Sequence, residues 1–161
     1  MTLQPIGFSD DEAARLRIAL ARISRAVDRT SADVGYTKTQ LSVLGTIVRL
    51  KSAGLSELAE FETLNPTMLS RVIGKLEAAA LIVRTPDEAD RRAVTVQPTA
   101  AGKNLHLKLR KRRGDLIAGQ LADLSPGGAD DLLKALPALE ELAEHMLSTT
   151  RKLSTTRKVA E

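Results

Sequence analysis

The sequence predicts a mainly helical protein of the α+β class with very little sheet. Alanine and leucine dominate the composition, with arginine, lysine and glutamate between them, and these residues favour helices. Aromatic residues make up 2% of the chain, and tryptophan is absent. Two short runs are β-prone, residues 81–85 and 93–96, and they flank a charged turn at residues 86–92. The length of 161 residues indicates one domain with a real core.

A capping box predicts the start of the first helix, because Ser9 is followed three residues later by Glu12. The apolar positions after it repeat with a period close to 3.5, which is typical of helices packed along one another. These positions are Leu16, Leu20, Ile23 and Val27. We expect this helix to end near Val34 and Gly35.

A second capping box, Thr37 with Gln40, predicts a helix that runs to about Lys51. Gly54 suits a left-handed cap after that helix, since glycine adopts positive φ without strain. Ser56 is then expected to cap a short third helix.

The fourth helix has the clearest start, because Asn65 is a preferred N-cap and Pro66 fits the first helical turn. One face is expected to be buried: Leu69, Val72, Ile73, Leu76 and Ala80. The opposite face is small or polar: Thr67, Ser70, Arg71, Gly74 and Ala78.

A long helix is predicted over residues 100–124, starting after Thr99. It contains the basic run 108–113, which could either extend a positive field toward DNA phosphates or form a solvated face. Residues 125–128 break the chain before the last helix, in which Pro137 should produce a kink or delay the start. Its apolar seam repeats like the first one: Leu132, Leu136, Leu139, Ala143 and Met146.

The tail, residues 148–159, contains two copies of a six-residue basic repeat. It is either a solvated, fraying end or a contact for DNA or a partner, and a single repeat pair is too little for a solenoid.

A helix, a turn, a second helix and a charged hairpin form the layout of a winged helix-turn-helix, which makes double-stranded DNA the leading partner. Small side chains let a helix approach the floor of a major groove, and hydroxyl and guanidinium groups can bind base edges or phosphates. The candidate major-groove residues are Thr67, Ser70, Arg71 and Lys75. In the turn, Arg91 and Arg92 could enter a minor groove, with Asp90 orienting a guanidinium. The alternatives are the ordinary polar face of an amphipathic helix and a solubilising turn.

The chain resembles the MarR (multiple antibiotic resistance regulator) family of bacterial transcription factors over about residues 35–102. Residues 90–96 and 99–102 look like the family's wing and the start of the helix that follows it. The family's recognition helix and first wing strand are similar to residues 65–72, 75–77 and 81–84. Gln97 and Pro98 depart from the pattern, since the family usually has an apolar residue before Thr99.

The resemblance implies a homodimer that binds a pseudo-palindromic operator. Residues 1–36 and 103–161 would form the helical dimerisation region, and residues 37–102 the winged helix-turn-helix, with the whole chain as one family domain. The seams of the first and last helices favour dimerisation independently, although packing within one chain is an alternative. The chain is expected to be a cytoplasmic repressor.

The family further implies release by a small phenolic or lipophilic acid, bound where the dimerisation region meets the winged domain. Tyr36 and His106 fall in those neighbourhoods and could bind an anion or an aromatic ring. Each could equally be a packing or surface residue.

Other classes of function are disfavoured. The chain has no cysteine, which excludes disulfides, cysteine-ligated metals and a thiol switch. The sequence shows no metal-ligand spacing, phosphate-binding loop or nucleophile motif, so we expect neither an enzyme nor a cofactor. No run approaches the length of a membrane span, and the first ten residues do not resemble a secretory signal. A net charge of +4 permits nucleic-acid binding without requiring it. A winged helix used only as a protein–protein module remains the alternative.

Overall fold

The computed structural model describes residues 7, 9–29, 34–86 and 94–159, with side chains as far as Thr149. Helices predominate, and a small antiparallel sheet accompanies them, as the sequence predicts. In chain order the elements are α1 (Asp10–Arg29), α2 (Lys38–Leu50), β1 (Ala53–Gly54), α3 (Leu55–Phe61), α4 (Pro66–Ala78), β2 (Ile82–Pro86), β3 (Val94–Pro98), α5 (Ala100–Ala122) and α6 (Gly128–Val159).

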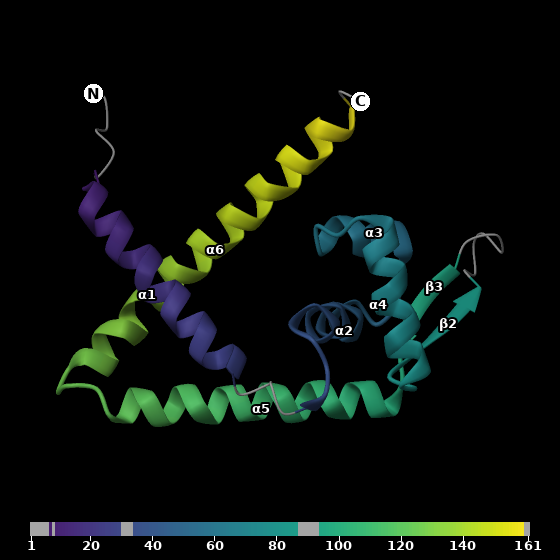
Figure 1. Cartoon of the computed structure of the whole chain (residues 1–161). Helices are drawn as coiled ribbons and strands as arrows, with labels where there is room; N and C mark the ends of the chain where they lie inside the picture. The colour runs from purple at the N-terminus through teal and green to yellow at the C-terminus, as the bar shows by residue number, and fades with distance from the viewer. Residues whose placement is uncertain (1–6, 8, 30–33, 87–93, 160–161) are drawn as a thin grey trace.

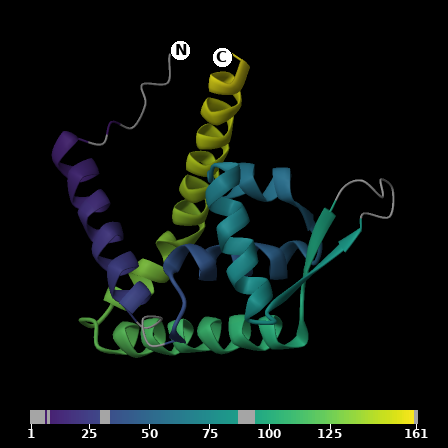
Figure 2. The ribbon, with the colours of Figure 1, turned by 45° about the vertical axis from the view of Figure 1, so that its right-hand side comes forward.

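The long helix α5 connects two parts of the molecule (Figure 1). Its N-terminal half lies beneath α2, α3, α4 and the sheet, which together form a winged helix-turn-helix. Its C-terminal half leads to α6, and α1 packs on α5 in that region. The view turned by 45° shows that α1 and α6 extend away from α5, with α6 passing beside α3 (Figure 2).

The sheet has the strand order β1-β3-β2, with both pairs antiparallel. The hairpin pairs Pro86 with Val94 at its outer end and Ile82 with Pro98 at its base. Pro98 is buried and is the last residue of β3, as expected for a residue without an amide hydrogen. The two-residue strand β1 was not predicted; it adds a third strand because Ala53 pairs with Val96.

Side-chain caps begin the helices where the sequence predicts them. Ser9 Oγ accepts from the Glu12 amide, and the Glu12 carboxylate accepts from the Ser9 amide at 2.9 Å. The Thr37–Gln40 capping box is likewise complete, with hydrogen bonds of 2.7 and 3.2 Å. The reciprocal bonds satisfy amides that would otherwise lack a partner in the first turn. Thr99 Oγ1 accepts from the Gly102 amide and so caps α5.

Several predicted boundaries are wrong. The left-handed residue after α2 is Lys51, with φ of 67°, because Gly54 is extended and paired within the sheet. Gly54 is therefore the N-cap of α3, so that Ser56 lies inside the helix and does not cap it. The described part of α1 ends at Arg29, and the predicted end near Val34 and Gly35 comes after residues 30–33, which lie outside the described residues.

The end of α4 and the course of α6 also differ from expectation. Ala80 is exposed and lies outside the buried stripe, because it adopts φ of 55° after the helix. Its amide donates to Glu77 O and the Leu81 amide donates to Leu76 O, which is the Schellman pattern of helix termination. Helix α6 begins at Gly128 and continues through Pro137, so the proline does not delay its start, and the predicted kink at Pro137 stays a prediction.

The core lies in the winged domain. Leucine, isoleucine and valine side chains of α2 and α4 interdigitate there with residues of α3 and the sheet. The fully buried members include Leu44, Ile47, Leu58, Ile73, Leu76, Ile82, Val43 and Val96. By contrast, α1 has no buried residue.

Gly102 allows α5 to begin directly against the end of α4. A Cβ at this position would lie 2.0 Å from the Leu81 carbonyl oxygen and 3.3 Å from Leu44 Cδ1. Any larger residue must therefore push α5 away from the winged domain.

We predict that Gly102→Ala lowers the free energy of unfolding by about 1–3 kcal/mol, as other overpacked cores do. Gly114→Ala is the matched control in the same helix, because its Cβ would meet nothing within 4 Å. The control should be stabilised by about 0.5–1 kcal/mol through lower backbone entropy. Urea unfolding measures both, and a Gly102→Ala variant as stable as the control would contradict the packing argument.

Candidate nucleic-acid interface

Helix α4 is anchored from one side and capped at its start. Asn65 Oδ1 accepts from the Met68 amide at 2.8 Å, and Pro66 occupies the first turn. The buried stripe of the helix comprises Leu69, Val72, Ile73 and Leu76. Since each of these side chains is at most 6% exposed, the outward face of α4 is fixed.

The outward face of α4 carries the predicted contact residues. Thr67, Ser70, Arg71 and Lys75 are all exposed. Gly74 lies among them and leaves the backbone uncovered, since a Cβ there would meet nothing within 4 Å. Within the part of the chain that the structure describes, neither Arg71 nor Lys75 forms an ion pair. These cationic groups are thus available to an anionic partner.

The β2–β3 hairpin, the wing, contacts α4. Arg84 on β2 forms an ion pair with Glu77 on α4 at 3.0 Å, and Thr85 and Thr95 hydroxyls lie 3.0 Å apart across the hairpin. An exposed pair of this kind contributes little stability. The hairpin itself is held by the backbone pairing of β2 with β3. The predicted wing residues Asp90, Arg91 and Arg92 lie outside the described residues.

A cleft of about 660 Å³ lies between α1, α2, the turn before α4, and α5. Three cationic and two anionic side chains line it together with tyrosine, leucine and hydroxyl groups. The lining comprises Ser24, Asp28, Arg29, Tyr36, Lys38, Thr39, Leu41, Ser42, Glu62, Leu64 and Arg113. The cleft can therefore accommodate a small molecule that combines an apolar part with charge.

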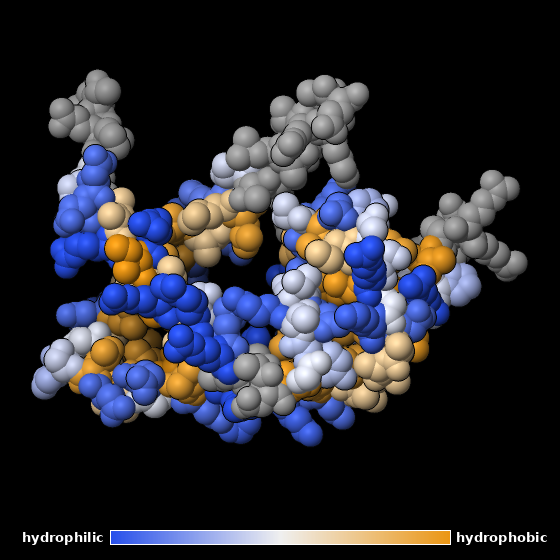
Figure 3. All heavy atoms as spheres, in the orientation of Figure 1, coloured by the Kyte–Doolittle hydropathy of each residue, from blue (hydrophilic) through white to orange (hydrophobic). Residues whose placement is uncertain are grey.

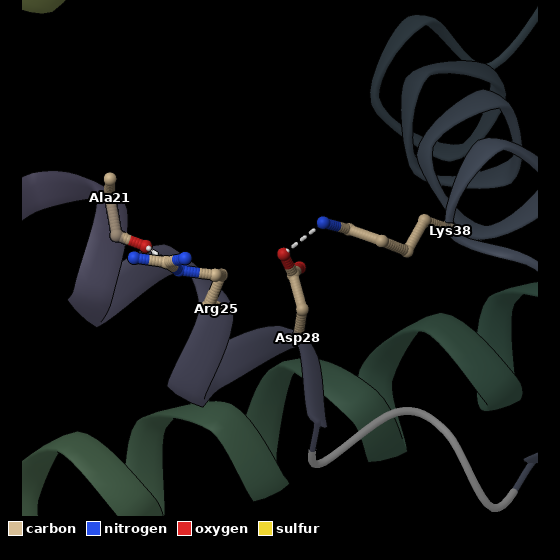
Figure 4. A network of polar contacts seen from close by, with 4 residues as sticks. All are labelled: Ala21, Arg25, Asp28 and Lys38. Atoms are coloured by element: carbon tan, nitrogen blue, oxygen red, sulfur yellow. Dashed lines mark hydrogen bonds and ion pairs between the residues drawn. The ribbon is translucent and has the colours of Figure 1, made fainter.

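An ion pair crosses one side of this cleft. Asp28 at the end of α1 and Lys38 at the start of α2 point toward each other, while Arg25 donates to the Ala21 carbonyl (Figure 4). Asp28 Oδ2 is buried and accepts no well-directed hydrogen bond, so its contact with Lys38 Nζ compensates the charge. This pair joins α1 to the winged domain.

The two predicted ligand-binding residues are separated in space. Tyr36 lines the cleft. His106 is half-buried and faces α2, since its imidazole would lie 3.3 Å from a Cβ built at Gly45. Burial first, and the positive charges of Arg110 and Arg113 second, lower the pKa of His106.

Sequence reasoning missed Asp28, Lys38, Glu62 and Arg113 as lining residues. Each is a single polar residue on a separate element, and polar residues at helix ends are common. No spacing pattern could have grouped them before the fold was known.

A model of the MarR family matches residues 36–94 of the chain, the region that contains the helix-turn-helix and the start of β3. The winged helix-turn-helix part of the chain therefore matches the MarR family, as the sequence-based resemblance implied. The MarR fold explains the order of helices and strands, and MarR proteins are DNA-binding transcriptional regulators rather than enzymes.

Relatives and solved structures agree with this assignment. A helix-turn-helix transcriptional regulator of Mycobacterium bovis is 28% identical over 132 residues, covering 82% of this chain and 92% of the relative. The transcriptional repressor MdtR of Bacillus subtilis is 28% identical over 110 residues, covering 68% of this chain and 69% of the relative.

Among solved structures, a transcriptional regulator of Thermotoga maritima superposes with a TM-score of 0.71 at 25% identity, covering 87% of this chain and 99% of that chain. BpsR of Bordetella bronchiseptica, whose DNA binding is regulated by 6-hydroxynicotinic acid, superposes with a TM-score of 0.57 at 24% identity, covering 85% of this chain and 98% of that chain.

The described residues include no cluster of histidine, cysteine, aspartate or glutamate that could hold a metal ion. Among the same residues, no helix is long and apolar enough to cross a membrane.

The lowered pKa of His106 predicts a pH dependence of stability. A folded-state pKa below the ordinary 6.5 means that the unfolded chain takes up the proton first as the pH falls. The neutral imidazole therefore contributes stability above pH 6.5, and that contribution is lost as the pH falls through 6.5 toward the folded-state value.

Urea unfolding of wild type and His106→Gln at about pH 7.5 and about pH 5 measures this contribution. We expect acidification to destabilise the wild type more than the variant. Equal losses in both proteins would show that His106 is not responsible.

Proposed function

We propose that this protein is a homodimeric repressor that binds a pseudo-palindromic DNA site and is released by a small organic acid. The outward face of α4 carries the proposal. It combines hydroxyl groups, an arginine and a lysine that form no ion pair among the described residues, and an uncovered glycine, on a helix whose opposite face is buried. Such a face suits the floor of a major groove.

The wing extends the proposed contact sideways. The pairing of β2 with β3 directs the hairpin away from the core, and residues Asp90, Arg91 and Arg92 stand in its connecting segment. Adjacent arginines on a thin hairpin suit a narrow minor groove, where the negative potential is strongest. We assign Arg92 to the groove and Asp90 to its orientation by the family resemblance.

Uncovered apolar surface supports the proposed dimer. Apolar side chains gather over α1, α6 and the part of α5 beside them (Figure 3). The exposed large residues on these helices include Ile18, Leu20, Ile23, Ile117, Leu132, Leu133, Leu136, Leu142, Met146 and Leu147. A single soluble chain rarely leaves so many together, and a second copy would cover them.

The cleft supports release by a ligand. It lies between α1 and the winged domain, so a bound molecule would contact both parts of the chain. The lining offers Tyr36 and leucines for a ring and Lys38, Arg29 and Arg113 for a carboxylate. The ligand-dependent DNA binding of BpsR is consistent with such a role.

The DNA-reading role is tested with duplexes selected by the protein from a random pool. Arg71→Ala or Arg92→Ala should each reduce binding of the selected duplex by about 1–3 kcal/mol. Arg17→Ala, an exposed arginine on α1, is the control and should change binding little.

Affinity is measured by fluorescence anisotropy at several salt concentrations, because phosphate contacts make it fall steeply with salt. If the wild type prefers no duplex over random DNA at moderate salt, the repressor role is wrong and a protein–protein module becomes the better explanation.

The dimer is tested by Leu136→Glu, which places a charge in the exposed seam of α6. The dissociation constant should rise at least about tenfold, since burying one leucine is worth about 1.5–3 kcal/mol. Val83→Glu is the matched control, because Val83 is equally apolar and 44% exposed but lies on β2. Sedimentation equilibrium should give twice the 17.3 kDa chain mass for the wild type and the control. A Leu136→Glu variant that dimerises like the control would exclude this seam from the interface.

A further inference from the structure

Glu62 stands where the cleft and the helix-turn-helix meet. It is the C-cap of α3 and also lines the cleft. Its two carboxylate oxygens are held separately: Ser42 Oγ donates to Oε2 at 2.8 Å and Thr46 Oγ1 donates to Oε1 at 2.5 Å. Both hydroxyls belong to α2, and Thr46 is 7% exposed. The carboxylate therefore fixes the turn after α3 to the central helix of the winged domain.

The same turn determines where α4 begins. Backbone bonds hold it compactly, from the Glu62 amide to Leu58 O at 2.9 Å and from the Leu64 amide to Ala59 O at 3.0 Å. Asn65, the next residue, caps α4. Because this turn is short and internally bonded, a displacement of Glu62 relative to α2 is passed on to the start of the outward face of α4.

Charge makes this connection sensitive to what occupies the cleft. Arg29, Lys38 and Arg113 attract an anion into the cleft, and Asp28 already pairs with Lys38. An anion held by these cations shares the cleft with the Glu62 carboxylate. Like charges at close range in a partly desolvated site disfavour the arrangement that brings them together.

We propose that Glu62 is a positioning residue that couples the cleft to the recognition helix. With the cleft free of anions, its bonds to Ser42 and Thr46 hold α4 in the DNA-reading position. A small organic anion in the cleft repels the carboxylate, weakens these bonds and lowers DNA affinity. This inference rests on the proposed function and assigns the regulation of that site to one side chain.

The proposed coupling between anion binding and DNA binding is negative. If the anion lowers affinity for DNA by some factor, DNA lowers affinity for the anion by the same factor. A neutral residue at position 62 that still accepts a hydrogen bond should keep α4 in the DNA-reading position but should no longer repel the anion. A residue at position 62 without an acceptor should lose the DNA-reading position of α4 as well as the repulsion.

Four variants separate these effects. Glu62→Gln keeps an acceptor without charge, Glu62→Ala removes the acceptor, and Thr46→Val removes one donor while keeping the shape. Glu57→Gln is the control, since it makes the same charge change at an exposed position on α3 that does not line the cleft. Full-length proteins are compared for the ratio of affinities for a selected duplex and for random DNA, with and without sodium salicylate and sodium benzoate. Urea unfolding monitors stability in parallel.

We expect Glu62→Ala and Thr46→Val to lose duplex discrimination, by about tenfold for Glu62→Ala, within the usual range of coupling between sites. Glu62→Gln should discriminate like the wild type within about threefold but respond much less to salicylate. The control should retain both properties. A merely structural role for Glu62 would instead lower stability and all DNA binding together in both Glu62 variants.

The outcomes also distinguish this inference from the proposed function. If the wild type selects no duplex, the DNA-reading function itself is wrong. If the wild type selects a duplex but neither acid weakens its binding, the coupling is wrong and the DNA-reading part stands. If the wild type responds and Glu62→Gln responds equally, coupling through Glu62 alone is overturned.

Discussion

The backbone carbonyls of Ala80 and Leu81 hold the start of α5 against the end of α4, and the geometry of the chain depends on this junction. Leu81 O accepts from the Thr99 amide at 3.0 Å, and Ala80 O accepts from the Thr99 hydroxyl at 2.7 Å. Gly102 lets the two backbones meet without a side chain between them. Because α5 leads from the wing to α6, this junction sets the angle between the outward face of α4 and the exposed apolar residues of α6.

The winged domain is also restrained from the other side. The Asp28–Lys38 pair ties the end of α1 to the start of α2, and Glu62 ties the turn before α4 to α2. Helix α2 is thus the element to which α1, the turn before α4 and the core all attach. Groups that line the cleft provide these two ties, so both lie beside the cleft rather than in the apolar core.

Local chemistry made much of the fold predictable. The caps at Ser9, Thr37 and Asn65 are satisfied by neighbours within three residues, so their hydrogen bonds can be read directly from the sequence. The buried stripe of α4 followed from its helical spacing, except for Ala80 beyond its end. Strand β1 was missed because two residues have no periodicity and their partner strand is distant in sequence.

The outward face of α4 could be predicted from the sequence, whereas the cleft could not. The outward face of α4 is a property of one helix, so its residues could be named in advance. The cleft is assembled from four separate segments, and no local pattern marks Asp28, Lys38 or Glu62 as neighbours. Tyr36 was named through a family resemblance, and the same reasoning named His106, which faces α2 instead.

The scarcity of aromatic residues has an optical consequence. The chain contains one tyrosine and no tryptophan, and that tyrosine, Tyr36, lines the cleft. The intrinsic tyrosine emission of the protein therefore comes from one side chain at one place. A molecule that enters the cleft would change the polarity around that phenol or quench its emission, and no residue of the outward face of α4 lines the cleft. The protein carries its own spectroscopic reporter of cleft occupancy, without a dye or an introduced label.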